Sequence, residues 1–196
     1  MKTLVEICEQ YNLKHNADGW KPGDPIFDST DKESWHKYCS GFYDKEFPKY
    51  RNLPINLLEI GVQKGGSMLL WNHYFTNAKI YGVDIIDYGS IEKTKGLSNV
   101  EVMVADAYND SFAKMLPNFD IIIDDGPHTY DSQVSAIKLY LPKLNDGGIM
   151  VIEDFLNDSW VEDYKKLVPQ GCSYEVIDTR VISGIPESLL FVIRKD

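Results

Sequence analysis

The sequence predicts an α/β domain built on a mostly parallel, seven-stranded sheet with helices on both faces. Short apolar runs of strand length alternate along the chain with segments of helical periodicity. This alternation is typical of parallel sheets whose strands are joined by helices. A glycine-rich turn follows the first predicted strand, and acidic residues follow four strands. Because parallel sheets hold ligands at the carboxyl ends of their strands, these features also predict where a ligand binds.

The elements follow from the local patterns in chain order. A run such as Ile55–Ile60 has the length and apolar content of a buried strand, and the segment after it has the apolar spacing of a helix packed on a sheet. We expect strands at 55–60, 79–83, 100–104, 119–124, 149–152, 174–178 and 189–193. We expect helices at 2–11, 35–47 (capped by Ser34), 67–75, 89–97, 112–116, 130–144 and 160–168, and turns or loops at 12–25, 145–148 and 183–186.

Length and composition set the class of protein. The 196 residues, 43% of them hydrophobic, suit one soluble domain. We expect a helical N-terminal or lid extension over residues 1–50 and a ligand-binding domain over residues 51–196. The net charge of -10 argues against nucleic acid as a partner, and no apolar run is long enough to cross a membrane. Three scattered cysteines and a first segment without a secretory signal favour a cytoplasmic protein with reduced thiols.

The stretch from Ile55 to Asp84 predicts a nucleoside-binding half-domain. It contains a strand, a glycine turn, a helix, a second strand and then Asp84, which stands where an acid usually holds ribose hydroxyls. The alternative is an ordinary strand-turn-helix without a ligand. A dinucleotide turn would carry glycines as G-x-G-x-x-G, but Gln63 occupies the second position. The turn therefore weighs against an NAD(P)-dependent oxidoreductase, which stays as an alternative.

Acidic pairs follow the fourth and fifth predicted strands. Asp124 and Asp125 end one strand, and Glu153 and Asp154 end the next. If the two strands are neighbours, they lie about 4.8 Å apart, and the carboxylates repel one another unless a cation or proton is shared. Oxygen ligands of this kind suit Mg2+, Ca2+ or Mn2+. Alternatively, single members of each pair cap helices or face water.

His128 follows the first acidic pair in a turn that contains Gly126 and Pro127. A neutral histidine can take a proton from a substrate hydroxyl at physiological pH. A divalent metal on the same hydroxyl would lower its pKa. A lone histidine in a turn is more often structural, but the acidic pairs favour the catalytic interpretation.

These motifs together resemble a known family. The segments LLEIGVQKGGS, YGVD, IIIDDGPHTYDSQ and GGIMVIEDF, with Thr30-Asp31-Lys32 before them, are similar to class I S-adenosylmethionine-dependent methyltransferases of the macrocin and mycinamicin type. These are metal-dependent sugar O-methyltransferases, and cephalosporin hydroxylase-like proteins are among their relatives. The resemblance covers most of residues 28–155 and implies a single Rossmann-like domain.

The resemblance also implies roles for individual residues. His128 matches the catalytic base, and the sequence leaves open whether Glu153 keeps the metal site intact. The implied magnesium ligands are Asp125, Glu153 and Asp154. The implied cofactor-binding residues are Glu59, Gly61, Gly65, Ser67, Asp84, Asp106 and Asp124, and the implied substrate or lid residues are Asp31, Lys32, His36 and Tyr38.

The function expected from residues and resemblance is a Mg2+-assisted O-methyltransferase. It would use S-adenosylmethionine to methylate a hydroxyl of a sugar or glycosylated small molecule. Besides the oxidoreductase, the alternative is a non-catalytic cofactor-binding or assembly protein, which would not depend on His128 or the acidic pairs. We expect a small-molecule acceptor, no nucleic acid, no membrane, and a possible homo-oligomer.

Overall fold

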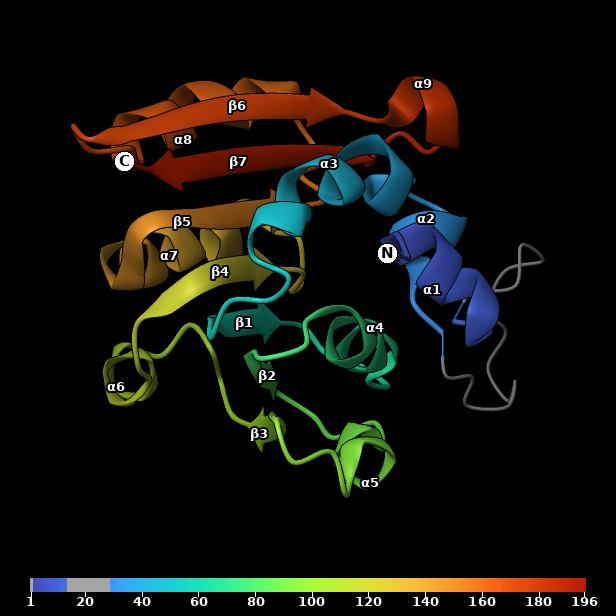
Figure 1. The fold of residues 1–196 in the computed structure, drawn as a ribbon. Coiled ribbons are helices and arrows are strands. Elements are labelled where there is room, and N and C mark those ends of the chain that lie inside the picture. Colours follow the sequence, from blue (N-terminus) through green and yellow to red (C-terminus); the bar gives the residue numbers. More distant parts are fainter. Residues whose placement is uncertain (1, 14–28) are drawn as a thin grey trace.

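The computed structural model describes residues 2–13 and 29–196, and its strands form one seven-stranded sheet. The strand order is β3-β2-β1-β4-β5-β7-β6 (Figure 1). Strands β1 to β5 run parallel, whereas β7 runs antiparallel to both β5 and β6. The mostly parallel α/β fold expected from the sequence is therefore confirmed. The strands are β1 (Asn56–Ile60), β2 (Lys79–Asp84), β3 (Val100–Val104), β4 (Phe119–Asp124), β5 (Leu144–Glu153), β6 (Cys172–Asp178) and β7 (Leu189–Lys195).

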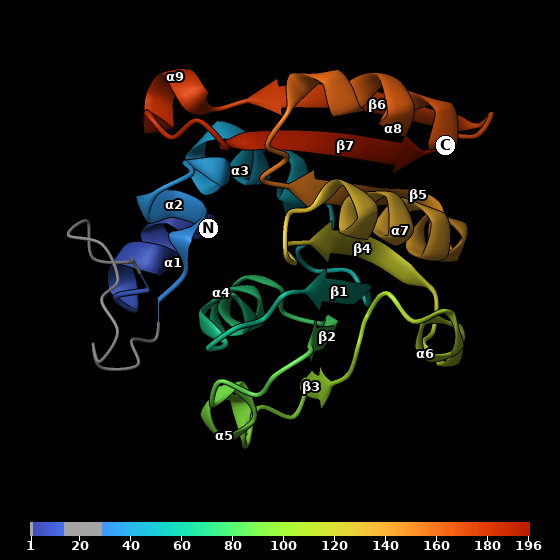
Figure 2. The same cartoon turned by 180° about the vertical axis from the view of Figure 1, so that it is seen from behind.

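Helices cover both faces of the sheet, and each face has its own hydrophobic core. Ile121 and Ile123 of β4 belong to one core and Ile122 to the other, as the two-residue period of a strand requires. Figures 1 and 2 show α7 and α8 on one side of the sheet, with α1, α3 and α4 on the other. The helices are α1 (Leu4–Gln10), α2 (Asp31–Ser34), α3 (Asp44–Glu46), α4 (Gly66–Tyr74), α5 (Ser90–Thr94), α6 (Asp110–Met115), α7 (Tyr130–Tyr140), α8 (Val161–Leu167) and α9 (Arg180–Ser183). Within the described ranges, none of the helices is long and apolar enough to cross a bilayer.

The N-terminal part of the chain packs on the sheet as an integral layer. Leu4 and Ile7 of α1 are buried in the same core as Trp71 of α4 and Ile121 of β4. In Figure 1 the arrowheads of β1 and β4 point to the side of the sheet where α1 and α2 lie. Residues 29–50, here called the cap segment, therefore begin beside the carboxyl ends of the strands, and their last part runs over the sheet to Tyr50, whose hydroxyl donates to the carbonyl of Gly147 in β5. The boundary at residue 50 stays a prediction, and most of the loop expected at 12–25 lies outside the described residues.

The single helix expected over residues 35–47 with Ser34 as its cap is wrong. The chain instead forms α2, whose cap is Thr30, and then a series of short turns. Lys37 has a φ of +59°, which a continuous right-handed helix does not contain. The break separates α2 from the buried aromatic residues that follow. Those later turns are η1 (Cys39–Tyr43), α3 and η2 (Phe47–Lys49).

The turn expected at residues 145–148 is also wrong, because this stretch lies inside β5. Leu144 already pairs with Phe119 of β4, and the pairing resumes with Ile149 opposite Ile121 after a shift in register. The Asn-Asp-Gly-Gly sequence forms an irregularity within the strand, and Gly147 adopts a left-handed φ of +74°. The glycines indicated a departure from regular backbone, but the strand continues through it.

Gly61 allows the ends of β1 and β4 to approach closely. It has a φ of +88°, and a Cβ atom added to it would lie 1.9 Å from the carbonyl oxygen of Asp125. The approach is fixed by backbone hydrogen bonds, since the N–H of Asp125 donates to the carbonyl of Ile60 at 2.8 Å. The glycine turn is therefore held directly against the segment that carries Asp125.

We expect Gly61→Ala to lower the free energy of unfolding by about 3 kcal/mol or more, because left-handed strain and a backbone clash add. Gly147→Ala is the matched control. Gly147 also has a positive φ, but no atom lies within 4 Å of its added Cβ, so the loss should be about 1–2 kcal/mol. Urea denaturation measures both, and equal losses would contradict the close approach at Gly61.

Candidate active site

Acidic side chains gather where the parallel strands end. Strands β1, β4 and β5 are consecutive neighbours in the sheet, and Glu59, Asp125 and Glu153 stand at or just beyond their carboxyl ends. Asp154 follows Glu153 and is buried beside it. The neighbouring strand ends expected from the sequence therefore bring both acidic pairs together at one edge of the sheet.

Asp125, His128 and Asp154 form a compact group at this edge. One ligand atom from each lies within 4.8 Å of the others. The Nε2 atom of His128 is 3.9 Å from Oδ1 of Asp125 and 3.9 Å from Oδ2 of Asp154. His128 and Asp154 have φ values of +54° and +55°, a strained conformation that is common at functional sites. The group offers two carboxylates and an imidazole to a shared cation.

Lys32 places its ammonium group among the strand-end acids. It belongs to α2, and its side chain is 0% exposed. Its Nζ atom lies 3.2 Å from Oε1 of Glu59, 2.8 Å from Oδ2 of Asp125 and 2.7 Å from Oε2 of Glu153. Burial disfavours its charged form, but the three carboxylates outweigh burial and hold the pKa of Lys32 well above its usual value.

Glu153 and Asp154 are further bound by aromatic residues of the cap segment. Tyr43 donates a short hydrogen bond to Oε1 of Glu153, and Tyr38 donates one to Oδ1 of Asp154. The Nδ1 atom of His36 lies 3.3 Å from the same Asp154 oxygen. Both oxygens of Glu153 are thus engaged, by Lys32 and Tyr43, and Glu153 is absent from the compact group. Its role as a metal ligand stays a prediction.

Burial changes the acidity of the groups in this site. Burial, reinforced by Glu153, raises the pKa of Asp154 to about 8. Burial also raises the pKa of Asp125, although Lys32 opposes this, and it lowers the pKa of His128. The acids are therefore costly to keep ionised without a cation, and His128 favours its neutral form.

The glycine turn connects β1 to the start of α4. Gly65 precedes α4 with a φ of +80°, and Gln63 between the glycines has a φ of +45°. The backbone N–H of Gln63 donates to Oδ2 of Asp84 at 2.7 Å, and that of Ile86 donates to Oδ1 at 3.2 Å. Asp84 therefore ties the turn to the end of β2 and remains partly exposed.

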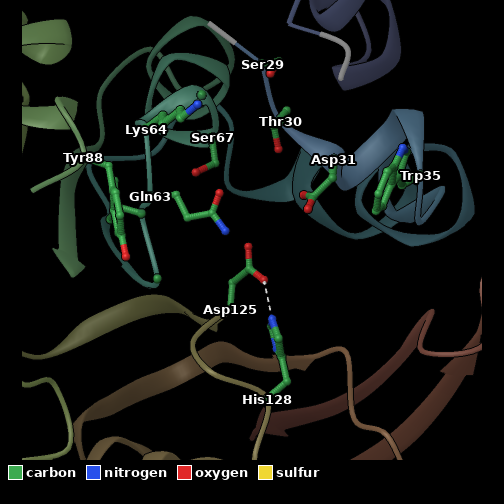
Figure 3. A pocket seen from close by; sticks show the side chains of 13 residues that line it. Ser29, Thr30, Asp31, Trp35, Gln63, Lys64, Ser67, Tyr88, Asp125 and His128 are labelled. Atoms are coloured by element: carbon green, nitrogen blue, oxygen red, sulfur yellow. Dashed lines mark ion pairs between the residues drawn. The ribbon is translucent and has the colours of Figure 1, made fainter. Parts of the chain in front are cut away.

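A cavity of about 440 Å³ lies between the cap segment, the glycine turn and the Asp125–His128 segment. This volume is within the range of small-molecule sites, about 300–1,000 Å³. Figure 3 shows Asp31 and Gln63 pointing into the cavity from opposite sides, above Asp125 and His128. The lining residues are Ser29, Thr30, Asp31, Trp35, Gly61, Val62, Gln63, Lys64, Gly66, Ser67, Tyr88, Asp125 and His128.

The cavity contains only part of the residue set predicted from the sequence. Of the predicted residues, it brings together Asp31, Gly61, Ser67, Asp125 and His128. The remaining predicted residues do not line it: Lys32, His36, Tyr38, Glu59, Gly65, Asp84, Asp106, Asp124, Glu153 and Asp154.

Several of the residues outside the cavity make specific contacts elsewhere. Asp124 is buried, and its Oδ1 atom accepts a hydrogen bond from the hydroxyl of Tyr108 at 2.7 Å. Burial raises the pKa of Asp124 to about 7. Asp106 is exposed and accepts from the backbone N–H of Tyr108. Glu59 is fully buried and accepts from Nε1 of Trp71 at 2.5 Å, so it faces the interior.

Eight lining residues were not selected as site residues from the sequence: Ser29, Thr30, Trp35, Val62, Gln63, Lys64, Gly66 and Tyr88. Gln63 and Lys64 lie within the glycine turn, where attention falls on the glycines, and Tyr88 follows Asp84 in a loop. Trp35 was expected as the first residue of a helix over 35–47, but it stands at the end of α2 and lines the cavity. Their side chains match no pattern of catalytic or metal-binding residues. Only their position in the chain, near the glycine turn or near a predicted acid, could have indicated them.

The fold and this site define an α/β domain of the Rossmann-like, class I methyltransferase type. Residues 58–155 match a family model described as a methyltransferase domain, and the chain belongs to that family.

Two curated relatives are O-methyltransferases by name. The chain is 32% identical over 152 residues to the mycinamicin VI 2''-O-methyltransferase of Micromonospora griseorubida, covering 74% of this chain and 38% of that protein. It is 29% identical over 179 residues to the L-olivosyl-oleandolide 3-O-methyltransferase of Streptomyces antibioticus, covering 85% of this chain and 45% of that protein. The chain therefore spans less than half the length of these relatives.

A solved structure has a similar fold. It is the MycE methyltransferase from the mycinamycin biosynthetic pathway in complex with Mg and SAH. The two chains are 27% identical with a TM-score of 0.62, and the match covers 86% of this chain and 40% of MycE.

We expect Tyr43→Phe to lower the free energy of unfolding by about 1–3 kcal/mol, because it removes a donor from the buried Glu153 carboxylate. Tyr130→Phe is the matched control. It also removes a tyrosine–carboxylate hydrogen bond, but its partner Asp163 is 47% exposed, so its loss should stay within about 0.5 kcal/mol. Urea denaturation of both variants measures the difference, and a loss at Tyr43 as small as that at Tyr130 would contradict this reading of the Glu153 contacts.

Proposed function

We propose that this chain is the cofactor- and metal-binding part of an O-methyltransferase that methylates a hydroxyl of a sugar or glycosylated small molecule. The observation that carries the proposal is the position of Asp125 and His128. Both line the cavity that the glycine turn bounds, and both belong to the compact group with Asp154. A methyl donor and a metal-held hydroxyl would therefore meet in one place.

The cofactor proposed is S-adenosylmethionine. The glycine turn and Ser67 line the cavity, and Asp84 at the end of β2 stands where ribose hydroxyls are usually held. Asp84 keeps a partly exposed carboxylate, while the exposed Ile85 and Ile86 beside it offer apolar surface. The family match and the SAH bound in MycE support this choice over a nicotinamide cofactor.

The donor chemistry of the compact group fits a divalent cation such as Mg2+. Asp125 and Asp154 supply the carboxylate oxygens that hard cations prefer, and we propose them as ligands. Both oxygens of Glu153 already make contacts, with Lys32 and Tyr43, so we do not include it among the proposed ligands. A bound cation would lower the pKa of a substrate hydroxyl and hold it in place.

His128 is proposed as the base that accepts the proton of that hydroxyl. Its Nε2 atom faces Asp125 and Asp154 at 3.9 Å, and burial favours the neutral imidazole that can accept a proton. The cap segment bounds the same cavity through Asp31 and Trp35 and so limits the access of water. Their side chains are the ones we propose to contact the acceptor.

A glycosylated acceptor is the substrate class that the relatives support. The L-olivosyl-oleandolide 3-O-methyltransferase is named for an acceptor that carries a glycosyl group, and the mycinamicin VI enzyme and MycE are named for the mycinamicin pathway. The cavity walls combine an aromatic ring, Trp35, with polar groups such as Asp31 and Gln63. Such a mixture suits a sugar ring, which presents both C–H faces and hydroxyls.

The proposal is tested by methyl transfer from radiolabelled S-adenosylmethionine to a panel of glycosides, with Mg2+ or with a chelator. We expect Asp154→Asn to lower the rate by about 100-fold or more, because even changes behind a metal ligand cost about 10- to 100-fold. The chelator should have the same effect on the unmodified protein. Asp158→Asn is the matched control, since Asp158 is 68% exposed and pairs with Arg180 on the surface.

Full transfer by Asp154→Asn, or transfer that the chelator leaves unchanged, would contradict the metal-assisted mechanism. A non-catalytic cofactor-binding protein would show no transfer to any glycoside, and its cofactor affinity would not respond to His128→Ala.

A further inference from the structure

Lys32 is the one residue of the cap segment that contacts carboxylates from three strands. Its ammonium group is paired with Glu59 beside the end of β1, Asp125 after β4 and Glu153 at the end of β5. The sequence resemblance placed it among substrate or lid residues, but its side chain is 0% exposed and lines no part of the cavity. Lys32 therefore contacts the carboxylates of the site from the protein interior and not from the cavity.

The charge of Lys32 does not fully balance the acids around it. Glu59, Asp125 and Glu153 each lie within 3.2 Å of its Nζ atom, and Asp154 is the next residue along the chain. Buried carboxylates in such numbers repel one another unless cations offset them. One lysine holds the cluster together, and the excess negative charge remains available to a second cation.

Asp125 belongs to both groups of charges. Its Oδ2 atom binds Lys32 at 2.8 Å, while its Oδ1 atom faces Nε2 of His128 in the compact group. A divalent cation between Asp125 and Asp154 would thus lie on the other side of the same carboxylate from the ammonium group. The two oxygens of Glu153 also have different partners. Its Oε2 atom accepts from Lys32, and its Oε1 atom accepts from Tyr43.

We propose that Lys32 is a resident counter-ion that competes with the divalent metal for Asp125. It holds the acids in place in the metal-free chain and weakens metal binding by electrostatic repulsion. Because Lys32 belongs to α2, metal binding is also coupled to the position of the cap segment. Lys32 is a positioning residue in this account, and the inference rests on the metal site of the proposed function.

The test is the affinity for Mn2+ alone, measured by the loss of the free-ion electron paramagnetic resonance signal, together with thermal melting with and without Mn2+. We expect Lys32→Met to bind Mn2+ roughly tenfold or more tightly, because a charge next to the ion is removed. The same variant should melt at a lower temperature without Mn2+ and recover more than the unmodified protein when Mn2+ is added.

Lys37→Met is the matched control in the same segment. Lys37 is partly exposed and pairs with Glu33 at 3.8 Å, away from the strand-end acids. Its removal should leave Mn2+ affinity unchanged and should not enlarge the thermal recovery. Lys32→Arg, which keeps the charge, should bind Mn2+ no more tightly than the unmodified protein.

A second comparison covers the case in which Lys32→Met does not fold. Glu153→Gln removes one acid, and the double variant Lys32→Met with Glu153→Gln restores the local charge balance. The double variant should bind Mn2+ more tightly than Glu153→Gln alone. Equal or weaker binding by a folded Lys32→Met variant, or by the double variant relative to Glu153→Gln, would show that Lys32 only preorganises the acids, and would overturn the inference.

The outcomes separate this inference from the proposed function. If the unmodified protein binds Mn2+ and Lys32→Met binds it no better, the competition fails while the metal site stands. If neither the unmodified protein nor any Lys32 variant binds Mn2+, the metal site itself fails, and the inference fails with it.

Discussion

The structure depends on how buried negative charge is balanced at the carboxyl ends of β1, β4 and β5. Close packing of parallel strands brings Glu59, Asp125 and Glu153 to one place, and Lys32 enters from α2 to pair with all three. Removing one partner of a buried ion pair lowers the free energy of unfolding by about 3–5 kcal/mol. This loss is far larger than the net stability that the intact pair contributes. The position of the cap segment over the sheet edge is therefore tied to the same contacts that shape the site.

The cap segment also explains why the backbone is irregular here. Tyr38 and Tyr43 must both reach inward to Asp154 and Glu153, and the break at Lys37 lets the chain turn between α2 and η1. His128, which lines the cavity, and Asp154, which faces it, likewise hold strained left-handed conformations. Strain of this kind persists only where surrounding contacts fix it, and here the ion pairs and the strand hydrogen bonds do so.

Local patterns predicted the sheet well because strand signals are local. The run Phe119–Asp124 and the run Val100–Val104 were predicted with the bounds that the structure has, since apolar residues of strand length lie between clear breaks. The sequence left open whether the fourth and fifth strands are neighbours, and the structure pairs them. The acidic pairs therefore meet at one edge, as expected for that case.

The partners of those acids could not be predicted in the same way. Lys32 meets Asp125 across 93 residues of sequence and Glu153 across 121 residues, and no local period encodes such a contact. The helix expected over 35–47 was wrong because Tyr38 and Tyr43 are buried against separate acids, and the chain reaches both through short, broken turns. Tertiary contacts of charged groups decided both cases.

The most direct test of the account is a calorimetric titration of the protein with S-adenosylhomocysteine, with Mg2+ and again with a chelator, using NAD+ as the control ligand. We expect micromolar binding of the thioether and none of NAD+. Asp84→Ala should weaken that binding by roughly 2–3 kcal/mol, the scale of hydrogen bonds to a charged group. If the folded protein binds no S-adenosylhomocysteine under either condition, the methyltransferase account of this cavity is wrong.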